Sequence, residues 1–239
     1  MRSPPRHPQL DVLYEDNHLL VVNKPAGLAT MGLPAGQPTL LNSAKEYVAQ
    51  KYGKTGNVYL GITSRLDAPV TGVVVLARTS KAAARLTEQF RSQAVEKIYW
   101  AIVEGRPQPD QAVWSDYLAD APRYRSVVVV PADAPGAQLA VLEYRRLGRS
   151  GIDSLIEVRP RTGRKHQIRV QFAHRVHPLI GDIKYGSKRT FPHVALHARM
   201  LVVAHPTREE TMTFIAPAPE SWKVLDLPAE LRRTAFARP

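Results

Sequence analysis

Between Val95 and Val158 the chain contains five consecutive runs of strand-forming residues, with turn signals but no helical pattern between them. Gly105-Arg106-Pro107 and Pro135-Gly136 are two of these turn signals. Strands that follow one another without helices pair as antiparallel neighbours, because a parallel connection needs a long crossover. The pattern therefore predicts an antiparallel meander. The five expected strands are Val95–Val103, Trp114–Leu118, Ser126–Val130, Gln138–Leu147 and Ile152–Val158.

The rest of the chain adds helices and further strands to this sheet. Thr39–Tyr52 and Ser80–Ser92 place apolar residues at helical spacing, and a shorter helix is expected from Lys165 to Arg175. We expect one α+β domain over residues 10–239, after a disordered tail at residues 1–9. Its sheet is expected to be mixed but mainly antiparallel, with helices and loops on its flanks. Further expected elements are strands around the turn Glu15-Asp16-Asn17, strands at Val58–Ile62 and Gly72–Ala77, a hairpin within residues 196–217, and a short helix near Pro228–Thr234.

The charge of the chain favours a polyanionic partner. Its 239 residues include 33 Lys+Arg against 21 Asp+Glu, a formal net charge of +12. Nucleic acid is the common partner of a protein this basic, although a generally basic protein without such a partner has the same balance. Six Lys or Arg and two His lie between Arg159 and Arg175, with no acidic residue among them. This segment, RPRTGRKHQIRVQFAHR, predicts a surface that follows phosphates.

Several kinds of site have no pattern in this sequence. There is no Walker, Gly-x-Gly-x-x-Gly or Gly-x-Ser-x-Gly motif, and the spacing of His166, His174 and His177 is not that of a metal site. We therefore expect neither a cofactor nor a metal. The chain has no cysteine, no apolar stretch as long as a membrane span and no signal-peptide core. These features predict a cytoplasmic location without membrane association.

Three residues are candidates for chemistry, each with a structural alternative. Asp67, in the segment Thr63–Arg78, lies in a tight turn before a strand and either organises that turn or presents a carboxylate. Arg169 lies in GRKHQIR, which forms either an anion site at a helix start or a solvated basic face. Tyr99 is either a core residue of its strand or a platform that stacks on a base.

Five segments in a fixed order extend this interpretation. Together they resemble the RluA family of pseudouridine synthases, in its short form without the N-terminal RNA-binding domain. The resemblance implies the pseudouridine synthase fold, with a catalytic cleft across the middle of the sheet, and isomerisation of selected uridines in ribosomal or transfer RNA. It implies an RNA stem-loop as partner and no metal or cofactor, and we expect a monomer. The segments are YEDNHLLVVNKPAGL, SRLDAPVTGVVVLAR, EKIYWAIVEG, RPRTGRKHQIRVQFAHRVHPLIGDIKYG and LHARMLVVAHP.

The resemblance also implies roles for individual residues. Asp67 matches the catalytic aspartate, and Arg65 matches the arginine that enters the RNA and helps to extrude the target base. Tyr99 matches the tyrosine that packs on the flipped base and assists proton movement. Arg169 matches the basic residue that pairs with the aspartate and keeps it ionised. Further expected RNA contacts in the basic segment are Arg161, Arg164, Lys165 and His166, with Arg159 and Arg175 as additional phosphate contacts.

The sequence departs from the family pattern on both sides of Asp67. Ser64 stands where the family has histidine, and Val70-Thr71-Gly72 replaces its Thr-Ser-Gly. Neither change removes an assigned chemical group, so both concern substrate choice more than activity. Two other function classes remain, namely a non-catalytic RNA-binding or ribosome-assembly factor and a hydrolase that uses Asp67 as nucleophile. The sequence does not identify the target uridine or its RNA.

Overall fold

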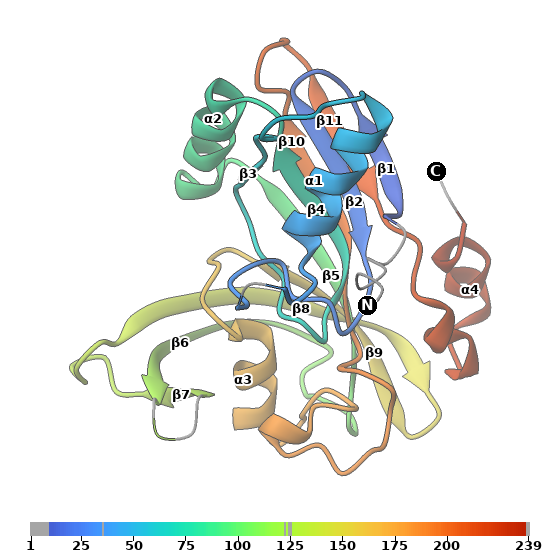
Figure 1. Cartoon of the computed structure of the whole chain (residues 1–239). Helices are drawn as coiled ribbons and strands as arrows, with labels where there is room; N and C mark the ends of the chain where they lie inside the picture. The colour runs from blue at the N-terminus through green and yellow to red at the C-terminus, as the bar shows by residue number, and fades with distance from the viewer. Residues whose placement is uncertain (1–9, 35, 122, 124–125, 238–239) are drawn as a thin grey trace. The chain divides into compact units, whose positions relative to one another are not determined.

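The computed structural model of the chain describes residues 10–34, 36–121, 123 and 126–237. The chain divides into two compact units (Figure 1). The first consists of Met1–Glu96 and Met200–Ala216, and the second of Lys97–Arg199 and Pro217–Pro239. The tail expected at residues 1–9 lies outside the described residues, and the single domain expected from residue 10 stays a prediction.

A mainly antiparallel sheet forms the first unit, as the sequence predicts. Its strands are β1 Val12–Glu15, β2 Leu19–Lys24, β3 Gly61–Ile62, β4 Thr71–Ala77, β11 Thr211–Ile215 and the part of β10 (Leu196–Ala204) from Met200 onward. The order is β1-β2-β4-β10, with β11 paired to β10 and β3 to β4. The pairs β1–β2, β2–β4, β3–β4 and β10–β11 are antiparallel. Of the strand expected over Val58–Ile62, only the last two residues form β3.

Two helices with threonine caps belong to this unit, α1 at Leu40–Lys51 and α2 at Ser80–Arg91. The hydroxyls of Thr39 and Thr79 accept hydrogen bonds from backbone nitrogens three residues further on, at 3.2 and 3.1 Å. Each cap satisfies a donor that the first turn of a helix leaves unpaired. In Figure 1, α1 lies in front of β2 and β4. Both helices agree with their predicted bounds to within a residue.

The central strands of this sheet are buried on both faces. Leu19 to Val22 have no solvent exposure, and every residue of β4 is buried. One face of the two strands packs on α2 through Ala82 and Leu86. Burial on both faces explains why these strands are continuous apolar runs rather than alternating ones. Lys24 ends β2 and is fully buried as well.

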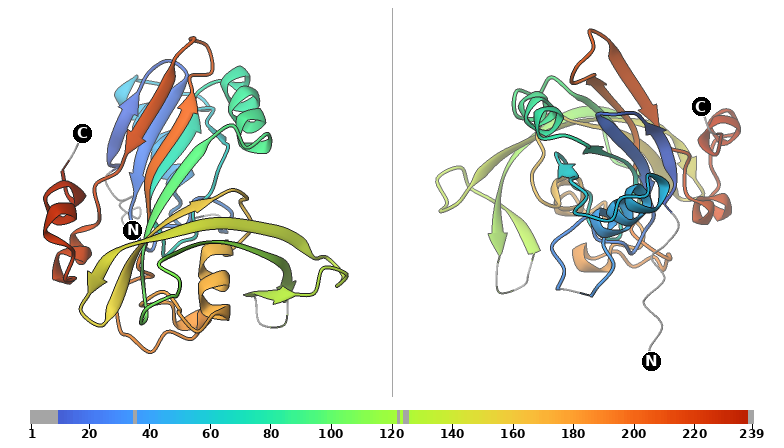
Figure 2. Two further views of the ribbon diagram at one scale, coloured as in Figure 1. Left: turned by 180° about the vertical axis from the view of Figure 1, so that it is seen from behind. Right: turned by 45° about the horizontal axis from the view of Figure 1, so that its top comes forward.

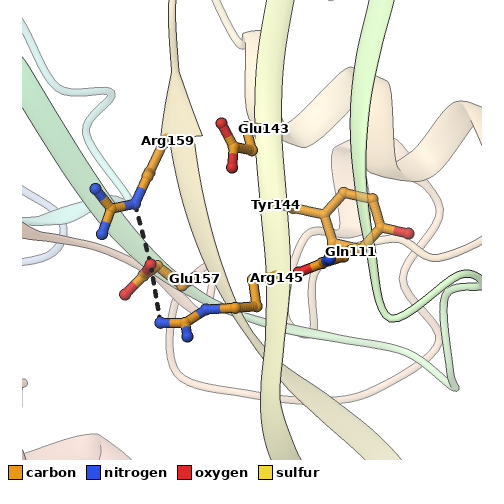
Figure 3. Close-up of a pocket in the computed structure, with 6 residues that line it drawn as sticks. All are labelled: Gln111, Glu143, Tyr144, Arg145, Glu157 and Arg159. Atoms are coloured by element: carbon orange, nitrogen blue, oxygen red, sulfur yellow. Dashed lines mark hydrogen bonds and ion pairs between the residues drawn. The ribbon is translucent and has the colours of Figure 1, made fainter.

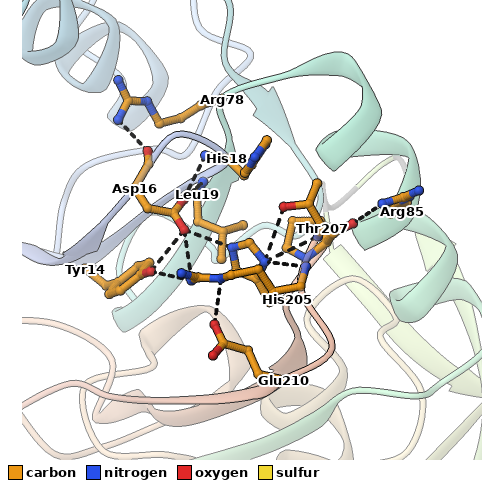
Figure 4. A network of polar contacts seen from close by, with 11 residues as sticks. Tyr14, Asp16, His18, Leu19, Arg78, Arg85, His205, Thr207 and Glu210 are labelled. Atoms are coloured by element: carbon orange, nitrogen blue, oxygen red, sulfur yellow. Dashed lines mark hydrogen bonds and ion pairs between the residues drawn. The ribbon is translucent and has the colours of Figure 1, made fainter.

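A polar network holds the turn between β1 and β2 (Figure 4). The Asp16 carboxylate accepts hydrogen bonds from the backbone nitrogens of His18 and Leu19, both at 2.7 Å, and from Nε2 of His205 at 2.9 Å. Nδ1 of His205 accepts from the Arg208 backbone nitrogen at 3.0 Å, so Nε2 carries the ring hydrogen. Burial raises the pKa of Asp16, but the hydrogen bonds outweigh this effect and lower it to about 2. The network therefore joins this turn to the turn between β10 and β11.

The second unit contains the predicted run of antiparallel strands. Its strands are β5 Glu96–Val103, β6 Gln111–Ala121, β7 Ser126–Val130, β8 Gln138–Ser150 and β9 Asp153–Pro160. Their order is β5-β9-β8-β6-β7, and each neighbouring pair is antiparallel. The prediction of a meander is therefore wrong, because only β6–β7 and β8–β9 pair with their neighbours in sequence. β6 extends beyond its predicted ends, because it pairs with β8 from Gln111 onward and with β7 as far as Ala121. β8 extends to Ser150, because its end pairs with β9. The back view in Figure 2 shows β8 running along this unit.

Two helices belong to the second unit, α3 at Gln167–His174 and α4 at Ala229–Ala235. α3 begins two residues later than predicted, because His166 has a left-handed φ of 55°, which an α-helix does not continue. The helix packs on β6 and β7. Short 3₁₀ segments, η2 at Ile183–Tyr185 and η3 at Glu220–Val224, complete the unit. Among the described residues, no helix is both long and apolar enough to cross a membrane.

Candidate active site

The turn that contains Asp67 lies directly before β4, which begins at Thr71. Leu66 is buried, Arg65 is exposed and Asp67 is half-buried. The Val70 backbone nitrogen donates to the Asp67 carbonyl at 3.0 Å and closes the turn. The leucine therefore anchors the turn, while the arginine and the aspartate on either side of it remain accessible.

A loop at the end of β2 fixes the backbone on both sides of Asp67. We call residues 24–30 the cradle loop. Oγ1 of Thr30 donates to the Leu66 carbonyl at 2.8 Å and accepts from the Leu66 backbone nitrogen at 3.2 Å. The Gly27 backbone nitrogen donates to the Ala68 carbonyl at 2.8 Å. Asp67 thus has both of its neighbours bonded to one loop, which restrains where its carboxylate lies.

Sequence reasoning missed Lys24, the first residue of the cradle loop. Its amine donates to the Ala68 carbonyl at 3.1 Å, although the pattern of residues 24–27 predicts only a turn. The alternation of side chains along a strand indicates its burial, because Lys24 lies on the same face of β2 as Leu20 and Val22. A lysine that continues a buried apolar face is unusual, because burying an ammonium is costly.

In the second unit, Arg169 of α3 forms a buried ion pair with Asp182. Its Nε and Nη2 atoms donate to the two carboxylate oxygens at 2.7 and 2.8 Å, and both side chains are 5% exposed or less. This two-bond geometry fixes the plane of the guanidinium. It uses the Nε–Nη2 edge, so the Nη1 edge is not part of the pair. The expected pairing of Arg169 with Asp67, which belongs to the other unit, stays a prediction.

Asp182 is a second residue that sequence reasoning missed. The preceding Gly181 has a φ of +77°, and a Cβ at this position would collide with the His193 carbonyl oxygen. Only glycine suits this backbone, so the turn before Asp182 depends on it. A glycine followed by an acidic residue close after the basic helix was the available signal.

The His166 side chain is half-buried and contacts another side chain of the protein. Its Nδ1 lies 2.7 Å from the Tyr185 hydroxyl, which also accepts a hydrogen bond from the Val127 backbone nitrogen at 3.1 Å. The guanidinium carbon of Arg169 lies 5.1 Å from the centre of the Tyr185 ring. The expected RNA contact of His166 stays a prediction.

Tyr99 lies on β5, where it pairs with Val158 of β9. The residue is half-buried, whereas Trp100 to Val103 after it are buried. Partial exposure of an aromatic ring is a condition for stacking on a nucleic-acid base. Its packing on a flipped base stays a prediction.

Three expected RNA contacts are exposed and only weakly engaged within the protein. Arg161 lies 3.6 Å from a Glu143 oxygen, and Lys165 lies 2.8 Å from an Asp120 oxygen. Nε of Arg164 donates to a backbone carbonyl at 2.9 Å. Exposed ion pairs contribute about 0–1 kcal/mol, so these cations can exchange their partners for phosphates at little cost.

Arg159 lines a polar pocket of about 280 Å³ on β8 and β9 (Figure 3). Glu157 lies between two arginines there, 3.1 Å from Nε of Arg159 and 3.4 Å from Nη2 of Arg145. The glutamate neutralises one of the two positive charges. Arg159 is therefore a weaker candidate for a phosphate contact than its position in the basic segment predicts.

Arg175 has a largely structural setting. Its two terminal nitrogens donate to the Asp116 carboxylate at 2.9 and 3.0 Å, and its guanidinium carbon lies 4.2 Å from the centre of the Trp114 ring. Burial raises the pKa of Asp116, but hydrogen bonds from Arg175 and Gln171 outweigh it and lower the pKa below its usual value. We therefore leave Arg175 out of the expected phosphate contacts.

The described residues contain no group of three or more His, Cys, Asp or Glu side chains that could hold a metal ion. The chemical groups placed near Asp67 in its own unit are the exposed Arg65 and the buried Lys24. A carboxylate with a nearby cation and an adjacent arginine can act as a nucleophile or base on an anionic substrate.

Comparison with known proteins gives consistent matches. A model of the RNA pseudouridylate synthase family matches residues 18–174. The chain is 36% identical over 222 residues to the dual-specificity RNA pseudouridine synthase RluA of Haemophilus influenzae, covering 90% of this chain and 95% of that protein. It is 36% identical over 235 residues to ribosomal large subunit pseudouridine synthase D of Pseudomonas aeruginosa, covering 90% and 70%. The solved structure of human RNA pseudouridylate synthase domain containing 4 matches with a TM-score of 0.78 and 27% identity, covering 91% and 94%.

Proposed function

The chain belongs to the RNA pseudouridylate synthase family, and we propose that it converts specific uridines in ribosomal or transfer RNA to pseudouridine with Asp67 as the catalytic carboxylate. It is an RNA pseudouridine synthase, an isomerase with the fold that its motifs predict. The observation that carries the proposed site is the cradle loop, which fixes both neighbours of an accessible aspartate within the family match.

Pseudouridine formation exchanges one glycosidic bond for another. The N1–C1′ bond of uridine breaks, the uracil turns, and a C5–C1′ bond forms. The proton on C5 leaves to solvent and N1 gains a proton, so the composition of the RNA does not change. An ionised carboxylate serves this reaction as a nucleophile at the sugar or the base, or as the base that removes a sugar proton. Asp67 is half-buried, which leaves its carboxylate within reach of a nucleotide.

The target uracil must leave its base stack before it can react. Extrusion of a base costs a few kcal/mol. We assign this step to Arg65, which is exposed two residues before Asp67 and can fill the place of the extruded base. Tyr99 is proposed to pack on the flipped uracil, and Arg169 is proposed to pair with the Asp67 carboxylate. Asp182 then serves to orient Arg169 through the Nε–Nη2 edge of the guanidinium.

The two bacterial relatives differ in their named targets, because one is called dual-specificity and the other is called a ribosomal large subunit enzyme. We propose a stem-loop of ribosomal or transfer RNA as substrate, with phosphates bound by the exposed cations Arg161, Arg164 and Lys165. A monomeric, cytoplasmic enzyme without metal or cofactor completes the proposal.

The test uses RNA transcribed with uridine that carries tritium at C5, because bond formation at C5 releases the label into water. The purified protein is mixed with transfer RNA transcripts and, separately, with large-subunit ribosomal RNA transcripts. Release that stops at a whole number of labels per RNA supports the proposal, and sequencing of the product locates the pseudouridine. Tight RNA binding with no release from either class would instead favour an RNA-binding factor without catalysis.

A further inference from the structure

Lys24 is fully buried and has a complete set of hydrogen-bond acceptors. Its Nζ atom donates to the carbonyl oxygens of Pro25 at 2.9 Å, Leu28 at 2.7 Å and Ala68 at 3.1 Å. An ammonium group has three N–H donors, so the three carbonyls match its charged form. A neutral amine has two hydrogens and would leave one of these carbonyls without its donor.

One of the three acceptors connects Lys24 to the proposed catalytic residue. The Ala68 carbonyl directly follows Asp67 in the chain and also accepts from the Gly27 backbone nitrogen at 2.8 Å. Thr30 holds the carbonyl and the nitrogen of Leu66 on the other side of Asp67. Lys24 is therefore the charged member of a cradle loop whose other bonds are neutral.

The charge of Lys24 acts mainly on one neighbour. On the elements around it, the ionisable groups are Asp67 and Arg65 in the turn, Asp11 before β1, and Tyr14 and Glu15 of β1, which lie opposite Val21 and Leu20 rather than opposite Lys24. Residues 25–30 and β4 carry none. The Asp11 carboxylate accepts a hydrogen bond from the Asn23 side chain at 3.1 Å. Burial lowers the pKa of Lys24 to about 7, and the charge of Asp67 acts in the opposite direction. This attraction is mutual, so the ammonium also draws the Asp67 carboxylate toward the cradle loop.

We propose that Lys24 is a positioning residue for Asp67, whose ammonium fixes the adjacent backbone and whose charge holds the carboxylate in place for the reaction. The inference rests on the proposed function of Asp67. Only the protonated form supplies both the third hydrogen bond and the charge. Turnover is therefore expected to fall as Lys24 loses its proton, while the fold and RNA binding persist.

The test measures single-turnover tritium release at saturating RNA from about pH 6 to about pH 9. The wild-type rate should fall with rising pH, with a midpoint near 7. Lys24→Gln keeps two N–H donors but has no charge. Its rate at pH 6 should therefore be about ten-fold lower than that of the wild type, and the rate should not fall further at alkaline pH. Its RNA affinity should stay within about two-fold of wild type, because Lys24 is buried.

Two further variants separate charge from general loosening. Thr30→Val removes the neutral bonds to Leu66, so it should slow turnover but keep the alkaline fall. Val22→Ala opens a cavity in the same strand and should lower the melting temperature without changing the pH profile.

A Lys24→Gln variant with the wild-type rate, or with the wild-type alkaline fall, would overturn the inference. The same holds if Thr30→Val abolishes the fall, since the effect would then not come from the charge of Lys24. If Lys24→Gln does not fold, the wild-type and Thr30→Val profiles still decide the matter. If the wild type releases no tritium from either RNA class, the proposed function itself fails and this inference falls with it.

Discussion

Asp16 and Lys24 lie at opposite ends of β2, and both carry a charge in a restricted environment. Asp16, before the strand, accepts two backbone hydrogen bonds and one from His205, and its pKa is lowered to about 2. Lys24, the last residue of the strand, has a pKa lowered to about 7 because it is buried. The environment of Asp16 stabilises its charged form, whereas the environment of Lys24 destabilises its charged form.

The charge of Asp16 therefore stabilises the fold, whereas the charge of Lys24 destabilises it. For Lys24, the interval between its usual pKa of 10.5 and about 7 corresponds to a cost on the order of 5 kcal/mol when it is protonated. An apolar residue would avoid this cost. Strongly perturbed groups of this kind concentrate at functional sites, and Lys24 lies beside the proposed catalytic aspartate. Asp16 needs no function beyond holding two turns together.

The largest expected effect concerns Arg169 and Asp182 of the second unit. They form a buried ion pair that, like the hydrogen bonds of Asp16, stabilises the fold. Replacing Arg169 by Met leaves the Asp182 carboxylate without its partner, so the free energy of unfolding should fall by about 3–5 kcal/mol. Asp182→Asn should destabilise the protein by a similar amount but keep the guanidinium. Urea unfolding measures both changes.

Turnover then distinguishes the two variants at a temperature where both are folded. Arg169→Met should lose turnover by more than about a hundred-fold, whereas Asp182→Asn should retain a larger part of it. Equal losses in the two variants would mean that Arg169 acts only through stability, and the proposed contact with Asp67 would have to be abandoned.

Asp16→Asn should lower the free energy of unfolding by about 2 kcal/mol at neutral pH, because the change in pKa from 3.8 to about 2 reflects this stabilisation. The contribution is complete above pH 3.8 and is lost as the pH falls toward 2. Turnover at saturating RNA should stay unchanged. Denaturant titrations of both proteins at several acid pH values provide the measurement, and a constant difference between them would refute the assignment.

Lys24→Gln should show a pH dependence of the same sign but in the alkaline range. Below about 7, Lys24 is protonated in both the folded and the unfolded chain, so the stability difference from the variant is constant. Between about 7 and 10.5 the unfolded chain holds a proton that the folded chain lacks. The wild type should therefore gain stability over the variant with rising pH, by at most about 1.4 kcal/mol per pH unit. A difference that stays flat through this range would show that Lys24 titrates normally.

The smallest effect is expected at the exposed cations, whose charges serve neither the fold nor the cradle loop. Replacing Arg161 and Arg164 by Gln should flatten the plot of log affinity against log salt by about 1.5 units, at about 0.7–0.9 per phosphate. Arg91→Gln is a matched control, because this arginine is also exposed but belongs to α2 of the first unit. An unchanged slope in the double variant would remove these two residues from the RNA-binding surface.

Much of the fold follows from local sequence signals. The caps at Thr39 and Thr79 and the apolar spacing after them define α1 and α2. The antiparallel pairing of β5 to β9 follows from strand runs without helices between them, but the order of these strands in the sheet does not. The sequence does not show the full length of the strands, because pairing with β8 extends β6 back to Gln111 and pairing with β9 extends β8 to Ser150.

The candidate site divides in the same way. The Arg65–Asp67 turn can be predicted from the sequence because its residues are adjacent in the chain. The cradle loop is not, since Thr30 and Leu66 are distant in sequence and meet only through the packing of the first unit. Lys24 escapes prediction because it is followed by Pro25-Ala26-Gly27, a pattern that predicts a turn rather than a buried side chain. Asp182 escapes because its partner Arg169 lies on a helix that the sequence assigns to RNA binding.

The most direct test of the proposed chemistry is tritium release by Asp67→Asn beside Asp16→Asn, under single-turnover conditions at saturating RNA. The two substitutions make the same chemical change at an aspartate of the same unit, and only the first is at the proposed catalytic position. We expect no release by Asp67→Asn, with RNA affinity within a few-fold of wild type, and a normal rate for Asp16→Asn. Measurable turnover by purified Asp67→Asn would contradict the assignment of Asp67 as the catalytic carboxylate.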